Sequence, residues 1–322
     1  RNSPVDSTAT SAPISPHLSS AGSFTAVRRM RLPFTISVLP SPAIVEMCAF
    51  AGFDFLVIDN EHGPASFETT EEMLRAARAS GLPQSPVDDL IALHVDLGKT
   101  VPDISLNAVA NLGYADGRFL APVFPGDTLR AVSEVIGVKE NSNGKTGVVW
   151  VRTRGYNQEN DEVLSYVRWV MVNKKDPSHP APATVVPELP QVVDPKELPE
   201  RSLSGAEYNF VLAGSPFGYE KYEIGEKIDH VDAFTVEEAE HQIATRLYQN
   251  TAKVHFNQYA QAQTPRGKRL IYGGVAISLA RSLAFNGLAN AAEIIAINAG
   301  QHVNPLGAGD TAPVTHELLR RT

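Results

Sequence analysis

The sequence predicts an α+β protein in which a helix wrapped by an antiparallel sheet occurs twice, preceded by a short strand–helix–strand–helix segment. Three observations predict this class. Residues 85–175 contain one helical pattern followed by several strand patterns with turns between them. A proline-rich stretch separates them from residues 215–322, where a second unit begins. A short motif recurs at matched positions on either side of that stretch.

The composition is that of an ordinary globular protein, with 43% hydrophobic and 20% charged residues. A formal net charge of −8 argues against nucleic acid as a partner. No apolar run approaches the ~20 residues of a membrane-spanning helix, so we expect no membrane partner either. The single cysteine, Cys48, favours a reducing compartment. We predict the cytoplasm, with the mitochondrial matrix as the alternative.

Residues 1–30 are rich in Ser, Thr, Ala and Pro and contain a single acid, Asp6. This composition is typical of a disordered leader, and loosely of an organellar targeting segment. We therefore expect the leader to lie outside the folded part of the chain.

The strand–helix–strand–helix segment occupies residues 31–84. We expect a strand at Thr35–Leu39, a helix at Pro42–Ala51, a buried parallel strand at Phe53–Asp59 and an amphipathic helix at Phe67–Ser80. These elements amount to a partial βα-barrel fragment, because a closed barrel takes ~250 residues.

The first repeated unit, residues 85–175, begins with a helix from Leu90 that Asp88 or Asp89 can cap. Asn141–Gly144 supplies a hairpin turn between the middle pair of strands. The predicted strands are Gly117–Phe124, Leu129–Lys139, Thr146–Tyr156 and Val163–Lys174.

Residues 176–214 contain seven prolines between Pro177 and Pro199, which predicts an extended linker. In the second unit, residues 215–322, Thr235–Gln249 is predicted as a helix with Thr235 as N-cap and Glu238 completing a capping box. Another helix is expected near Gly274–Leu288, after a Gly-rich turn.

The repeated motif reads P-x3-G-D-T, at Pro122–Thr128 and again at Pro305–Thr311. Each copy lies downstream of a helical pattern that opens with Leu-Ile, at Leu90 and at Leu270. Matched motifs behind matched elements predict a duplicated unit.

This motif after a central helix resembles the hot-dog fold of MaoC-like dehydratases. Longer strings, including His94–Phe119, Glu237–Asn257 and Arg269–Ala291, are similar to mesaconyl-CoA hydratases (β-methylmalyl-CoA dehydratases). The resemblance covers residues 85–311. It implies a double hot-dog with both copies incomplete, an acyl-CoA substrate, and a possible homodimer that covers exposed sheet surface.

The resemblance also implies a catalytic pair. The class places an acid and a histidine on a D-x-N-P-[IL]-H string, which matches Asn250–His255 here with Asn250 in the place of the aspartate. A histidine suits the proton transfers of enoyl-thioester hydration. We therefore predict His255 as general acid/base and Asn250 as the residue that positions water.

The hydration of a thioester also needs its oxygen stabilised as an enolate develops. Tyr272, Gly273 and Gly274 precede a helix whose N-terminal N–H groups can bind that oxygen, and we favour Gly274 as the donor. Val275 and Ala276 follow where the family has a histidine. No metal or redox cofactor is implied, since coenzyme A belongs to the substrate.

The remaining charged and histidine residues receive simpler interpretations. Arg266, Lys268 and Arg269 form a basic cluster suited to the phosphates of coenzyme A, with solvated surface charge as the alternative. His94 and Asp96 in the first unit are interpreted as structural, and His230 and His241 as surface or packing residues without a catalytic role.

A second resemblance lies in Phe53–Pro64, which looks like the start of a metal-dependent HpcH/HpaI-type aldolase, with His62 in proton transfer. It covers about 50 residues and lacks that family's later metal ligands. The leading hypothesis is therefore a hydro-lyase acting on an enoyl-CoA, most directly mesaconyl-CoA. The alternatives are an inactive fusion or truncated remnant, and a metal-dependent aldolase.

Overall fold

The computed structural model describes residues 35–37, 39–51, 56–58, 64–80, 86–106, 108–200, 210, 215–291 and 293–319. The chain divides into two compact units, Arg1–Gln84 and Ser85–Thr322, and each is described by itself. Within the described ranges, no helix has the length and apolar character needed to cross a membrane.

The N-terminal unit contains two parallel strands and two helices in the predicted order. These are β1 (Thr35–Ser37), α1 (Pro42–Ala51), β2 (Leu56–Ile58) and α2 (Phe67–Ala79). A small core of Val45, Met73 and Ala76 joins the helices.

One prediction for this unit is corrected. The strand expected over Phe53–Asp59 is described only at Leu56–Ile58, and Val57 is 41% exposed, so this strand is not buried on both faces. His62, like residues 1–34, lies outside the described residues.

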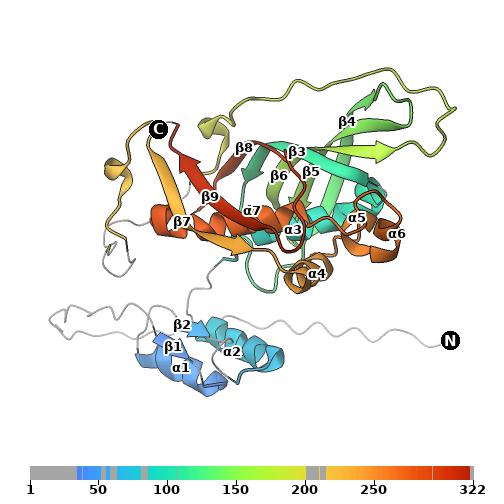
Figure 1. Ribbon diagram of the computed structural model, residues 1–322. Coiled ribbons are helices and arrows are strands. Elements are labelled where there is room, and N and C mark those ends of the chain that lie inside the picture. The colour runs from blue at the N-terminus through green and yellow to red at the C-terminus, as the bar shows by residue number, and fades with distance from the viewer. Residues whose placement is uncertain are drawn as a thin grey trace, which may run out of the picture. The chain divides into compact units, whose positions relative to one another are not determined.

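The C-terminal unit is built on a five-stranded antiparallel sheet of order β4-β5-β6-β3-β8 (Figure 1). Asp88 caps α3 by accepting a hydrogen bond from the Leu90 N–H (2.9 Å), as predicted. A π-helical turn, η1, follows α3 directly. The elements are α3 (Asp89–Thr100), η1 (Val101–Ser105), β3 (Ala108–Phe119), β4 (Arg130–Glu140), β5 (Thr146–Tyr156), β6 (Glu162–Asn173) and β8 (Ala296–Gln301).

The helix α3 lies against this sheet and supplies much of the core. Leu90, Leu93 and Leu97 pack on Phe119 of β3 and Leu164 of β6. At about 25 cal/mol per Å² of apolar surface buried, each such leucine contributes roughly 2 kcal/mol. The core therefore fixes α3 over the centre of the sheet.

One strand of this sheet lies elsewhere than the sequence pattern predicts. A strand is expected over Gly117–Phe124, whereas β3 ends at Phe119 and the chain beyond it forms an irregular turn. Pro122 and Pro125 have no N–H to donate to a ladder. The sequence of β3 gives a weak strand signal, because Gly113–Gly117 contains two glycines and an aspartate, which are depleted in strands, although all five residues are buried.

In the described residues, the rest of the C-terminal unit contains the helices α4 to α8, two short 3-10 turns at Pro195–Glu197 and Tyr219–Lys221, and a separate antiparallel pair of strands, β7 with β9. The elements are β7 (Lys227–Thr235), α4 (Glu238–Leu247), α5 (Lys253–Phe256), α6 (Gln258–Ala262), α7 (Gly273–Leu283), α8 (Phe285–Leu288) and β9 (Thr311–Glu317).

The predicted capping box of α4 is wrong. Thr235 ends β7 instead, and its hydroxyl lies 2.8 Å from that of Thr311 on β9. The helix begins later, at Glu238, with Glu237 as N-cap. Pairing with a strand distant in sequence therefore determines the conformation of Thr235, which local sequence cannot reveal.

The duplicated motif folds in the same way in both copies. Asp127 accepts a hydrogen bond from the Phe124 N–H (2.8 Å), and Asp310 accepts one from the Gly307 N–H (2.7 Å). The glycine before each aspartate has a positive φ, +98° and +89°. From the first helical residue to the turn aspartate there are 38 residues in one copy (Asp89 to Asp127) and 37 in the other (Gly273 to Asp310).

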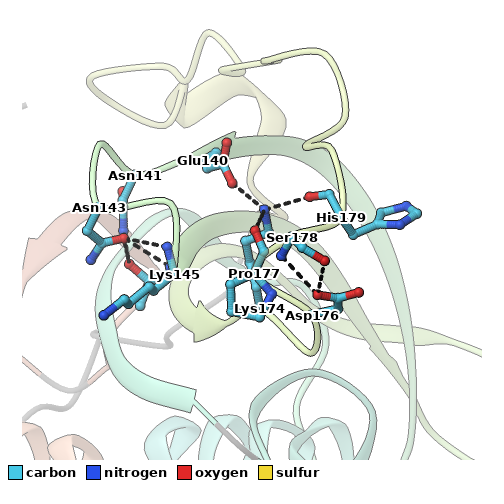
Figure 2. A network of polar contacts seen from close by, with 10 residues as sticks. Glu140, Asn141, Asn143, Lys145, Lys174, Asp176, Pro177, Ser178 and His179 are labelled. Atoms are coloured by element: carbon cyan, nitrogen blue, oxygen red, sulfur yellow. Dashed lines mark hydrogen bonds and ion pairs between the residues drawn. The ribbon is translucent and has the colours of Figure 1, made fainter.

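The segment after β6, predicted as an extended linker, packs along the sheet through specific contacts. Lys174 binds the Glu140 carboxylate and the His179 carbonyl (2.8 Å), as Figure 2 shows. Further along, Val185 forms a bridge with Val138 of β4, and the Val193 N–H donates to Asn298 of β8 (2.9 Å). These contacts cover part of the exposed β4 edge.

Candidate active site

A cavity of about 570 Å³ lies where the two copies of the repeat meet. One wall comes from α3, η1, β3 and β6, and the other from α5, the start of α7 and the segment after β8. Its polar lining residues include Asn111, Arg168, Asn250, His255, Arg266 and His302.

His255 lies on the short helix α5 and lines this cavity. Its Nδ1 is 2.8 Å from the Leu270 carbonyl oxygen. Because a carbonyl only accepts, Nδ1 carries the proton and Nε2 keeps its lone pair. Burial lowers the pKa of His255 to about 4, so the ring is neutral near pH 7 and its Nε2 carries no proton.

Asn250 is only 3% exposed and lines the same cavity. It follows Gln249, whose φ of +57° ends the turn after α4. The Asn250 side-chain oxygen makes one long contact, 3.4 Å from the Ala252 N–H, which leaves its amide with bonding capacity. The structure thus brings together the two residues that the sequence paired.

The helix α7 begins at the cavity wall without a side-chain cap. Gly273 lines the cavity, and a Cβ on it would come within 2.5 Å of the His302 ring. Gly274, the donor favoured from sequence, is buried against the Tyr272 ring and does not line the cavity. Tyr272 lines the cavity, and its hydroxyl is 3.1 Å from Nδ1 of His94. Gly273 is therefore better placed than Gly274.

The predicted basic cluster is dispersed. Arg266 is exposed and lines the cavity. Arg269 instead forms an ion pair with Glu238 on α4, which occupies its guanidinium. Lys268 is exposed and lies beside Gly307 in the second repeat turn, and it does not line the cavity.

The histidines interpreted as non-catalytic are all buried. His94 bonds Ser278 of α7 (2.8 Å) as well as Tyr272. The His241 ring stands 6.1 Å from that of His255, and His230 bonds His316 on β9 (2.8 Å). The surface placement allowed for His230 and His241 is therefore wrong, and all three side chains are packed inside the unit.

Several polar lining residues are absent from the sequence predictions, among them His302, Arg168 and Asn111. The His302 ring faces Gly273 and lies 5.6 Å from the Tyr114 ring. His302 lies three residues before Pro305 of the repeated motif, and this position could have identified it from the sequence as a candidate site residue. Arg168 and Asn111 lie on strands without any local motif, so the sequence carries no comparable signal for them.

These features define the class of protein. A repeated unit of helix and antiparallel sheet, with a neutral histidine and an uncapped helix N-terminus on one cavity, is the arrangement of a hot-dog enzyme of the MaoC-like class.

Comparison with known proteins identifies the family. The mesaconyl-CoA hydratase family model matches residues 61–313. The mesaconyl-CoA hydratase of Cereibacter sphaeroides is 64% identical over 76% of this chain and 70% of its own length. The β-methylmalyl-CoA dehydratase of Chloroflexus aurantiacus is 57% identical over the same shares. This chain belongs to the mesaconyl-CoA hydratase family.

Solved structures agree on the fold. A putative MaoC domain protein dehydratase from Chloroflexus aurantiacus matches with a TM-score of 0.72 and 57% identity, over 76% of this chain and 70% of that one. A Mycobacterium tuberculosis protein described as a double hotdog matches with a TM-score of 0.57 and 24% identity, over 72% and 69%. The second likeness supports the fold alone.

Proposed function

We propose that this chain is a hydro-lyase that interconverts an enoyl-CoA thioester and its β-hydroxy form, most directly mesaconyl-CoA and β-methylmalyl-CoA. The observation that supports this proposal most directly is that His255, Asn250 and the uncapped N-terminus of α7 line the same cavity. Its relatives bear the names of these two directions of one reaction.

The proposed reaction assigns a role to each group. The Asn250 amide orients a water molecule, and Nε2 of His255 takes its proton as the water oxygen bonds to Cβ. The π electrons of the double bond move onto the thioester, where the N–H of Gly273 stabilises the enolate oxygen. The proton then passes from His255 to Cα, which restores the neutral ring.

The other two functions considered from the sequence are less well supported. An inactive remnant gives no reason for His255, Asn250 and Gly273 to gather on one cavity. The aldolase-like resemblance of residues 31–84 stays a proposal about ancestry. Its His62 lies outside the described residues, and the family model and the relatives both point to hydration.

Three further features are proposed on sequence grounds. The reaction needs no cofactor besides the coenzyme A of its substrate. The single cysteine supports a reducing compartment, the cytoplasm or the mitochondrial matrix. A homodimer would cover sheet surface that one copy leaves exposed.

The test is the loss of enoyl-thioester absorbance when the protein meets mesaconyl-CoA. We expect turnover from the unchanged chain and a fall of about 10³-fold in kcat/KM for His255→Ala, since general acid–base catalysis contributes roughly 10²–10⁴-fold. His179→Ala is the control, because that side chain is exposed on the segment after β6 and does not line the cavity. Full turnover by His255→Ala would overturn the assignment.

A further inference from the structure

The wall of the cavity formed by β3 and β6 carries a buried positive charge. Arg168 of β6 is 1% exposed and lines the cavity, and its backbone partner across the ladder is Tyr114 of β3. Its guanidinium donates to the hydroxyls of Ser105 (2.6 Å) and Thr100 (2.9 Å). Both partners are uncharged.

Among the described residues, no carboxylate forms an ion pair with Arg168, and its Nε has no hydrogen-bond partner. Two other arginines of the same sheet are different. Arg118 and Arg152 both bind the Asp116 carboxylate at 2.8 Å. A buried cation without an anion costs several kcal/mol, so proteins rarely keep one without a function for it.

Asp96 is a buried acid whose pKa the charge of Arg168 influences, but it is a poor counterion. Its carboxyl group packs against Gly155 of β5, where a Cβ would come within 2.7 Å of Oδ1. The Tyr166 hydroxyl lies close enough to lower the pKa of Asp96, but neither Asp96 oxygen makes a hydrogen bond of normal geometry with the described residues. Burial also raises the pKa of Asp96 to about 7, which keeps much of it uncharged near neutral pH.

Other unsatisfied polar groups line the same cavity. The Asn111 amide is buried beside the Tyr114 hydroxyl, and in the described part of the chain neither its oxygen nor its nitrogen makes a hydrogen bond of normal geometry. Nε2 of His302 is likewise buried and unbonded there. Arg168 and Asn111 offer N–H donors to an anion, on the opposite wall from His255.

We propose that Arg168, assisted by Asn111, binds the free carboxylate of a dicarboxylic acyl thioester and thereby selects this substrate class. The inference rests on the proposed hydro-lyase function and identifies a residue that sets its specificity. With the carboxylate held by Arg168 and the thioester at the start of α7, the double bond lies between them, within reach of His255.

The kinetic test compares two substrates that differ at one group. Mesaconyl-CoA carries the carboxylate, and (E)-2-methylbut-2-enoyl-CoA carries a methyl group in its place. We expect the unchanged chain to favour mesaconyl-CoA by about 100-fold or more in kcat/KM, because a site built for a polar group rejects the analogue that lacks it. In Arg168→Met this preference should fall to within a few-fold of unity, whereas Arg168→Lys should retain part of it.

Arg152→Met is the matched control. It removes an arginine from the neighbouring strand that is ion-paired and does not line the cavity, so it should leave the preference intact. Equal kcat/KM for both substrates in the unchanged chain would overturn the proposal while the hydro-lyase function stood. An undiminished preference in Arg168→Met, or an equal loss in Arg152→Met, would also overturn it.

A binding measurement separates this inference from the proposed chemistry. Succinyl-CoA and butyryl-CoA differ by a carboxylate and have no double bond to hydrate. Calorimetry should show succinyl-CoA binding about 10-fold or more tightly to the unchanged chain, with the difference lost in Arg168→Met. If that holds but mesaconyl-CoA is not hydrated, the hydro-lyase function fails and carboxylate recognition stands. Equal affinities would overturn carboxylate recognition whatever the catalysis.

Discussion

The two copies of the repeat share a turn but differ where their central helices begin. Asp127 and Asp310 close the same turn in the same way. At the start of α3, the Asp88 carboxylate accepts a hydrogen bond from a backbone N–H, whereas α7 begins at Gly273 and its N-cap residue, Tyr272, provides no side-chain cap. In the first copy a carboxylate of the protein thus occupies the anion site of the helix, and in the second that site opens onto the cavity.

This difference shows that one copy of a duplicated unit can stabilise the fold while the other copy supplies the catalytic groups. An uncapped helix N-terminus loses about 1 kcal/mol of stability but gains donors for a ligand. The first copy keeps the stabilising cap and contributes most of the buried core, including Leu90, Leu93 and Leu97 of α3. The second copy contributes His255, Asn250 and Gly273.

Among variants that test the difference between the two helix starts, the largest effect is expected where the open start of α7 is closed. In Gly273→Ala, the added Cβ would come within 2.5 Å of the His302 ring and intrude on the oxyanion position. The backbone N–H remains, but the Cβ would keep the thioester oxygen away from it, so we expect kcat/KM for mesaconyl-CoA to fall by about 10²–10³-fold, the usual cost of losing one oxyanion contact. Gly300→Ala on β8 is the control, because a Cβ there meets no atom within 4 Å. Unchanged kinetics in Gly273→Ala would place the thioester oxygen elsewhere.

A second prediction concerns the buried acid of the first copy. Burial raises the folded-state pKa of Asp96 from 3.8 to about 7. As the pH rises, Asp96 loses its proton at a lower pH in the unfolded chain than in the folded chain. The contribution of Asp96 to the free energy of unfolding is therefore fully present below about pH 4 and is lost as the pH rises to about 7. Asp96→Asn removes this dependence.

Urea denaturation at several pH values checks that prediction. The stability of Asp96→Asn minus that of the unchanged chain should increase by a few kcal/mol between about pH 4 and pH 7, at roughly 1.36 kcal/mol per pKa unit. Taking the difference cancels the buried histidines, whose lowered pKa values act in the opposite direction. A difference that stays flat with pH would mean that Asp96 is ionised throughout.

The smallest effect is expected at the cap of the first copy. Asp88→Ala removes the side-chain acceptor of the Leu90 N–H and should cost about 1 kcal/mol of unfolding free energy. Its kcat/KM should equal that of the unchanged chain, since Asp88 does not line the cavity. A large kinetic defect would contradict the division of roles between the copies.

Local signals in the sequence are sufficient for many elements. The helix at Pro42–Ala51, the strand at Thr146–Tyr156 and the cap at Asp88 all occur as predicted, because periodicity and capping act over a few neighbouring residues. Where pairing between strands distant in sequence determines the local conformation, the predictions are wrong, as at Thr235 and at β3.

The sequence by itself determined the duplicated unit, the family resemblance and the pairing of Asn250 with His255, since motifs and a short turn carry each of these. Only the tertiary structure decided which glycine lines the cavity, and that the basic residues near α7 do not act together, since Arg269 pairs with Glu238. It also decided that Arg168 and Asn111, on paired strands, line the cavity with His255. Such residues lie far apart in sequence, and their shared cavity arises only when the sheet and helices pack together.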